Sequence, residues 1–130
     1  VAETGFDRIT PDQTVSQNMN IERSYETAAG KRPFEIWIKE IKEIHTRAKI
    51  LTRLDRLKLG NFGDCKTLQE GVCELRIHYG PGIRIYYGKV GNKVILLLCG
   101  GDKGSQDRDI VKAKEYLKDY QSREIGHGKK

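Results

Sequence analysis

Apolar and polar residues alternate on both sides of a Gly-Pro-Gly break near the middle of the chain. Residues 72–79 read Val-Cys-Glu-Leu-Arg-Ile-His-Tyr, and residues 83–87 read Ile-Arg-Ile-Tyr-Tyr. Successive side chains of a strand point to opposite faces of a sheet, so this alternation predicts two half-buried strands. A glycine-containing break between two such runs is typical of a hairpin. We therefore predict an antiparallel hairpin with a loop of three residues, Gly80, Pro81 and Gly82.

A loop of this length determines which side chains face one another. The predicted pairs are Tyr79 with Ile83, His78 with Arg84, and Arg76 with Tyr86. One face of the hairpin is then apolar, and the other carries two guanidiniums, an imidazole and a phenol. These donors suit an anionic ligand, above all phosphate. Two other outcomes stay open: the face is an ordinary solvated sheet surface, or a register shifted by one residue separates the two arginines.

Helical spacing of apolar residues predicts two helices before the hairpin. The first opens at Pro33, a favourable residue for a first helical turn, and carries Phe34 and Trp37 inward. The second covers residues 46–59. Its polar face is almost entirely basic, so it is either a solvated surface or a contributor to polyanion binding. From this face we select Arg53 and Arg56 as candidate contacts to a polyanion.

The C-terminal side predicts one more strand and one more helix. Residues 93–99 are apolar at both alternating sets of positions, which indicates a central strand or one covered by a helix. We expect the strand to break at Gly100-Gly101 and the last helix to run to about Tyr120. With an edge strand at residues 20–25, the prediction is an α+β domain: a small twisted, mainly antiparallel sheet of an N-terminal strand plus a three-stranded meander, with helices against one side.

Composition places most of this chain in one basic globular domain. Of its 130 residues 37% are hydrophobic and 32% charged, and the formal charge is +6. Residues 1–18 carry a net −2, which leaves +8 on residues 19–130. We interpret residues 1–18 as a disordered tail or upstream extension, 19–121 as the domain and 122–130 as a flexible basic tail. The charge of the domain indicates a polyanionic partner, either nucleic acid or an acidic protein segment.

Several classes of protein are not favoured by the sequence. Neither an apolar run of about 20 residues nor a secretory signal pattern is visible, so we expect a cytoplasmic protein without a membrane partner. The three cysteines, Cys65, Cys73 and Cys99, lack a C-x-x-C spacing and fit a reducing compartment. The three histidines are scattered, so we predict neither a metal site nor a cofactor.

Several motifs in a fixed order resemble a known family. They are Tyr-Glu-Thr-Ala at 25–28 with Gly-Lys-Arg-Pro-Phe at 30–34, Lys-Leu-Gly-Asn-Phe-Gly-Asp-Cys-Lys at 58–66, Glu-Leu-Arg-Ile-His at 74–78, Ile-Arg-Ile-Tyr-Tyr at 83–87, Leu-Leu-Leu-Cys-Gly-Gly-Asp-Lys at 96–103, and Gln-x-x-Asp-Ile at 106–110. This set resembles the RelE/ParE toxin superfamily, in particular its HigB-like branch of addiction module killer proteins. The resemblance covers residues 19–121.

The resemblance implies a RelE-like fold and a toxin encoded beside an antitoxin. Toxins of the RelE type cut messenger RNA on the ribosome, and the HigB-like branch is placed with them, whereas ParE-type members inhibit DNA gyrase. We therefore expect a metal-independent, ribosome-dependent mRNA endonuclease with a cognate antitoxin as its protein partner. A gyrase inhibitor and an inactive RNA-binding module of the same fold are the alternatives.

The same motifs suggest a role for each candidate residue. Arg76 and Arg84 match the arginines of the two hairpin strands and are expected to clamp the scissile phosphate, with Lys103 after the final strand beside them. His78 is chosen for proton transfer, because an unperturbed imidazole titrates near neutral pH. The predicted RNA contacts are Tyr86, for stacking or hydrogen bonding, together with Lys66, Arg53 and Arg56.

Overall fold

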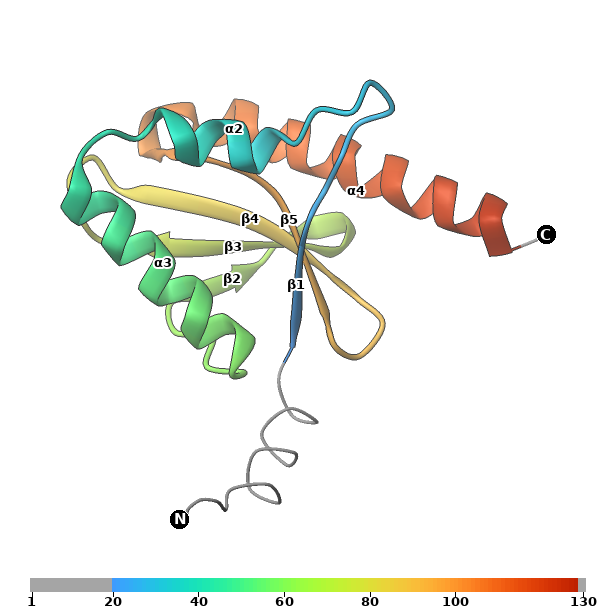
Figure 1. Cartoon of the computed structure of the whole chain (residues 1–130), viewed down its shortest axis with the longest axis horizontal. Helices are drawn as coiled ribbons and strands as arrows, with labels where there is room; N and C mark the ends of the chain where they lie inside the picture. The colour runs from blue at the N-terminus through green and yellow to red at the C-terminus, as the bar shows by residue number, and fades with distance from the viewer. Residues whose placement is uncertain (1–19, 129–130) are drawn as a thin grey trace, which may run out of the picture.

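The computed structural model describes residues 20–128, which form one five-stranded sheet packed against three α-helices (Figure 1). The elements in chain order are β1 (Ile21–Ser24), α2 (Pro33–Glu40), α3 (Ile44–Lys58), β2 (Cys65–Thr67), η1 (Gln69–Gly71), β3 (Val72–Ile77), β4 (Ile83–Val90), β5 (Val94–Asp102), η2 (Lys103–Ser105) and α4 (Gln106–Gly128). The expected α+β class is confirmed. Residues 1–18, predicted as a tail, lie outside the described residues. Within those residues, no helix is both long enough and apolar enough to cross a membrane.

The sheet has the order β1-β5-β4-β3-β2, so strand order in space differs from order in the chain. Strands β2 to β5 form an antiparallel meander, and β1 pairs in parallel with β5, with Ile21 opposite Val94. The meander therefore has four strands where the sequence pattern predicted three. The additional strand is β2, whose Lys66 pairs with Glu74 of β3.

Helices cover both faces of this sheet, which corrects the prediction that they lie on one side (Figure 1). On one face α2 and α3 bury residues such as Phe34 and Leu54 against Leu75 of β3. On the other face α4 buries Leu117 against Leu96 of β5. The reason lies in β5, which is apolar at both sets of alternating positions and so needs a helix on each face to keep its side chains from water.

The strand β5 continues through Gly100-Gly101 to Asp102, although the sequence predicted a break at the two glycines. The glycines are required by close packing. A Cβ atom on Gly100 would overlap the Trp37 ring of α2, and one on Gly101 would overlap the Asp109 carboxylate of α4. Each glycine thus lets a helix approach the end of the sheet on its own face.

The last helix is longer than expected, because residues 122–128 are helical and not an irregular tail. Two contacts explain the continuation past Tyr120. The Arg123 guanidinium donates to the Asp119 carboxylate one turn earlier, at 2.6 Å, and to the backbone oxygen of Glu26 at 2.7 Å. Asp119 in turn accepts from the Tyr25 hydroxyl at 2.6 Å. These bonds hold this part of α4 against the segment that follows β1.

The packing at Gly100 gives a stability prediction. Gly100→Ala should lower the free energy of unfolding by about 1–3 kcal/mol, because the added methyl group must displace the Trp37 ring. Urea denaturation followed by circular dichroism measures the change. Gly104→Ala is the matched control, since its Cβ would meet a single atom, Asp102 Oδ1, at 3.3 Å. Equal midpoints for the two variants would contradict the packing argument.

Candidate active site

The β3–β4 hairpin places Arg76 directly opposite Arg84. The predicted pairing is wrong by two residues, because the observed loop comprises residues 78–82 instead of 80–82. Within it the Tyr79 N–H donates to the Ile77 carbonyl at 2.9 Å, and both Gly80 and Gly82 adopt positive φ, a conformation that glycine tolerates best. A shift of two residues leaves every side chain on its predicted face. The two arginines are therefore brought together, as expected, but as direct neighbours.

A buried carboxylate lies one row along the same face. Glu74 of β3 is 0% exposed and accepts three hydrogen bonds, from Arg76 Nε at 2.9 Å, Tyr86 Oη at 3.1 Å and Gln106 Nε2 at 2.7 Å. Burial acts to raise the pKa of Glu74, but these three donors outweigh it and leave the pKa below its ordinary value. Glu74 is thus a buried anion at neutral pH, and it orients the Arg76 side chain. Glu74 was not among the predicted site residues, although its place two residues before Arg76 put it on the same face.

Tyr86 is buried and does not form the RNA contact that was predicted for it. Its side chain is 0% exposed, in the cluster that α4 covers, and its hydroxyl donates to Glu74. Burial and the neighbouring Glu74 charge raise the pKa of Tyr86 above its ordinary range. Strand alternation predicted the correct face for Tyr86, but it does not report that a helix covers this part of the face. A base cannot stack on Tyr86 in this structure.

Arg84 and Lys103 line one hollow of about 400 Å³ together with His78 and the hairpin loop. We call this the arginine hollow; its lining residues are His78, Tyr79, Gly80, Pro81, Gly82, Arg84 and Lys103. Lys103 reaches it from η2, immediately after β5, because Asp102 pairs with Ile83. Across from Arg84 on β5 stands Gly101, and the side chains of Ser105 and Asp109 pack above it.

The Arg84 guanidinium has spare hydrogen-bonding capacity. Its Nε atom is buried and, among residues 20–128, has no hydrogen-bond acceptor. An unpaired buried donor is costly, so such an atom favours binding of an acceptor from outside the protein. A phosphate in the arginine hollow would supply that acceptor and would also offset the repulsion between the Arg76 and Arg84 charges.

His78 lies at the rim of the arginine hollow and is held by an acidic partner. Its side chain is 75% exposed, and its Nε2 atom lies 2.5 Å from a carboxylate oxygen of Asp64. The His78 hydrogen bond is the main cause that lowers the pKa of Asp64. The backbone oxygen of Asp64 also accepts from the Arg76 N–H at 2.9 Å, so the loop before β2 is fixed against β3. Asp64 was missed because it is distant in sequence and follows no periodic pattern.

The two arginines predicted on the second helix have different environments. Arg53 donates to the backbone oxygens of Arg76 at 2.8 Å and Phe62 at 3.1 Å, so its guanidinium links α3 to the end of β3. Arg56 is exposed. Both line a second hollow of about 290 Å³, which His78 also lines. We call the surface of α3 that carries Arg53 and Arg56 the basic strip. Because His78 lines the arginine hollow as well, the basic strip adjoins that hollow.

Lys66 is not brought together with the other candidates. It is exposed on the edge strand β2, opposite Glu74, and it lines a separate hollow with Lys114 of α4. Among residues 20–128, His, Cys, Asp and Glu side chains do not form a group of three suited to a metal ion. The thiols of Cys65, Cys73 and Cys99 are free.

The Glu74 network predicts a pH-dependent loss of stability. At pH 7 Glu74→Gln should lower the free energy of unfolding by about 3 kcal/mol, because the half-buried Arg76 guanidinium loses its anion. The pKa of Glu74 in the folded protein lies below its value of about 4.3 in the unfolded chain. The stabilisation is therefore complete above the pKa of the unfolded chain, and it is lost as the pH falls through the pKa of the folded protein. Urea titrations from pH 7 to pH 3 should therefore show wild type and variant converging in acid. Glu115→Gln, at an exposed site on α4, is the control. If the difference in unfolding free energy between wild type and Glu74→Gln is the same at all pH values, Glu74 is not the stabilising anion.

Comparison with known proteins places the chain beside a bacterial relative. No protein-family model matches the chain. Over 81 residues it is 46% identical to a protein of Haemophilus influenzae described as uncharacterized, and the match covers 62% of this chain and 82% of that protein. At this identity and coverage the two chains share a common fold and ancestry. The chain therefore belongs to the same family as this Haemophilus influenzae protein.

Proposed function

We propose that this chain is a RelE-like toxin of the HigB-like branch, which cuts messenger RNA on the ribosome and is silenced by a cognate antitoxin. The observation that carries the proposal is the row formed by Arg76 and Arg84, with Lys103 beside it in the arginine hollow. The motif resemblance supplies the biological setting. The antiparallel meander with two preceding helices and one following helix agrees with the layout that the resemblance implies.

The chemistry suited to this hollow is attack by the 2′-hydroxyl of RNA on the adjacent phosphate. The 2′-oxygen forms a bond to phosphorus and loses its proton, while the bond from phosphorus to the 5′-oxygen breaks and that oxygen gains a proton. The products are a 2′,3′-cyclic phosphate and a free 5′-hydroxyl. Negative charge accumulates on the phosphorane oxygens, where the Arg84 and Lys103 cations of the hollow would stabilise it, with Arg76 as the neighbouring cation opposite Arg84.

His78 is the proposed proton-transfer group. Asp64 engages Nε2 of the ring, which leaves Nδ1 for the substrate. A carboxylate in this place orients the imidazole and favours one tautomer. The side chain is exposed at the rim of the hollow, so a ribosome-bound message can reach it.

The proposed antitoxin would cover the basic surface formed by the arginine hollow and the strip carrying Arg53 and Arg56. An acidic segment fits this surface because residues 19–130 carry a formal +8. The exposed apolar residue Leu51 of α3 lies in the same helix as the basic strip and would add apolar contact area.

The arginine clamp gives the decisive activity test. Arg84→Ala should reduce cleavage of translated message about 10²–10³-fold, because one of the cations that stabilises the phosphorane is lost. Cleavage is followed by primer extension on translating ribosomes and on free message, with codon-phased cuts expected only on ribosomes. Arg23→Ala on β1 removes an exposed cation away from the hollow and should leave the rate unchanged.

Three results would count against the nuclease. Absence of cuts in translated message would overturn it. Accumulation of cleaved DNA complexes with gyrase would identify the ParE-type alternative. Unchanged growth after induction of the gene without an antitoxin would indicate an inactive RNA-binding module.

The proton-transfer role of His78 has its own test. His78→Gln should slow cleavage about 10²–10⁴-fold, the usual contribution of a positioned proton-transfer group. Single-turnover rates on programmed ribosomes measure the change. If His78→Gln cleaves at the wild-type rate while Arg84→Ala does not, the histidine role is wrong and the phosphate clamp stands.

A further inference from the structure

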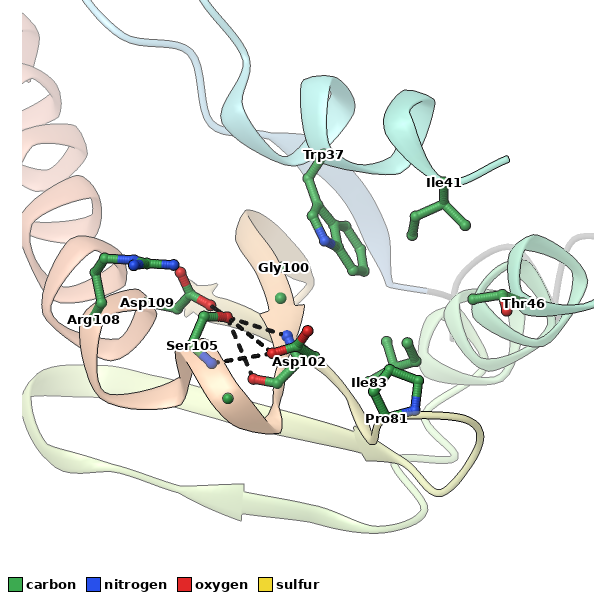
Figure 2. Close-up of a pocket in the computed structure, with 12 residues that line it drawn as sticks. Trp37, Ile41, Thr46, Pro81, Ile83, Gly100, Asp102, Ser105, Arg108 and Asp109 are labelled. Carbon is green, nitrogen blue, oxygen red and sulfur yellow. Dashed lines mark hydrogen bonds between the residues drawn. The ribbon is translucent and has the colours of Figure 1, made fainter. Parts of the chain in front are cut away.

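A larger hollow of about 610 Å³ adjoins the arginine hollow on the side of α2 and α4 (Figure 2). We call it the tryptophan hollow, because the Trp37 side chain extends into it from α2. The two hollows share Pro81 of the hairpin loop. Lys103, which lines the arginine hollow, stands between Asp102 and Gly104, which line the tryptophan hollow. A group bound to a phosphate at Arg84 and Lys103 therefore lies next to this second space.

The walls of the tryptophan hollow differ in character. Its apolar lining residues are Trp37, Ile41, Pro81 and Ile83. The Asp102 and Asp109 carboxylates lie across the hollow from Trp37 and Ile41 (Figure 2). A flat apolar surface facing hydrogen-bonding groups is the usual environment of a bound nucleobase.

The two carboxylates keep acceptor capacity for a ligand. Ser105 engages one oxygen of each: its N–H donates to Asp102 Oδ1 at 3.1 Å, and its hydroxyl donates to Asp109 Oδ2 at 2.5 Å. The second oxygen of each carboxylate has no side-chain or backbone donor among residues 20–128. Two anions and one cation, Arg108, line this space, so a second phosphate is disfavoured, whereas an uncharged hydrogen-bond donor is favoured.

We propose that the tryptophan hollow binds the base of the nucleotide next to the scissile phosphate and selects bases that carry an exocyclic amino group. Adenine, cytosine and guanine present such a donor, whereas uracil presents carbonyl acceptors at that edge. The base contacts Trp37, and its amino group donates to the Asp102 carboxylate. This inference rests on the proposed function, because the phosphate held by Arg84 brings the base to the hollow.

The test uses Trp37 itself, which is the single tryptophan of the chain. Trinucleotides of 2′-O-methyl adenosine, cytidine or uridine bind without being cut, because the attacking hydroxyl is blocked. The adenosine and cytidine trimers should quench Trp37 emission and bind about tenfold more tightly than the uridine trimer, the ratio for one hydrogen bond to a charged acceptor. Inorganic phosphate, which fills only the arginine hollow, should leave the emission unchanged.

Asp102→Asn sharpens the test without disturbing the local fold. The variant keeps the Oδ1 acceptor for Ser105, and its new amide donates to the uracil carbonyl, so the tenfold preference should fall to about twofold or less. Asp107→Asn is the matched control, because Asp107 is exposed in the first turn of α4 and does not line the hollow. Circular dichroism verifies that both variants are folded.

The outcomes separate this inference from the proposed nuclease. Equal affinity for all three trimers, or Trp37 emission that does not respond, overturns the base site even if translated message is cut. An amino-group preference that Asp102→Asn abolishes supports the base site, even if translated message is left intact and the nuclease proposal fails.

Discussion

The buried carboxylate of Glu74 is the interaction on which the candidate site depends. Three donors from three different elements converge on it: Arg76 of β3, Tyr86 of β4 and Gln106 of α4. An isolated charge with no exposure to water would be strongly unfavourable, and these bonds offset that cost. Because Gln106 is the first residue of α4, the same carboxylate fixes where this helix starts above the sheet.

The start of α4 divides one face of the sheet into a buried part and an accessible part. The row that contains Glu74 and Tyr86 lies beneath the helix, whereas the next row, with Arg76 and Arg84, lies beyond its first turn and stays half-buried. Gly101 continues that row on β5, where the side chains of Ser105 and Asp109 pack above the strand. A difference of two residues along a strand thus separates core from candidate active site.

Cationic and anionic side chains also lie close together at this site. Arg84 and Lys103 make the arginine hollow cationic, and the strip of α3 next to His78 extends this character. On the other side of Lys103, the Asp102 and Asp109 carboxylates line the tryptophan hollow. A phosphodiester with its attached base has the corresponding distribution: an anionic linkage beside an uncharged, hydrogen-bonding ring. The proposed nuclease function and the proposed base site therefore draw on one continuous surface.

The local pattern of residues was sufficient to predict several features of the structure. Alternation over residues 72–87 predicted the hairpin and put Arg76 and Arg84 on one face. The loop length was wrong by two residues, but two residues are a full strand period, so the predicted faces stayed correct. Pro33 and the apolar spacing after it predicted α2. The α+β class followed from the order of these elements, since periodicity is a property of neighbouring residues and needs no information from distant ones.

Tertiary structure alone decided which parts of each face are covered. Tyr86 and Arg84 have the same periodicity and differ only in whether α4 passes over them. The contacts of His78 with Asp64, and of Glu74 with Gln106, join residues 14 and 32 positions apart. Gly100 and Gly101 looked like a strand end, yet they extend β5 because Trp37 and Asp109 need the space that a side chain would occupy. Strand and helix periods specify the direction of a side chain, but whether water, a helix or a ligand meets it depends on how the elements pack.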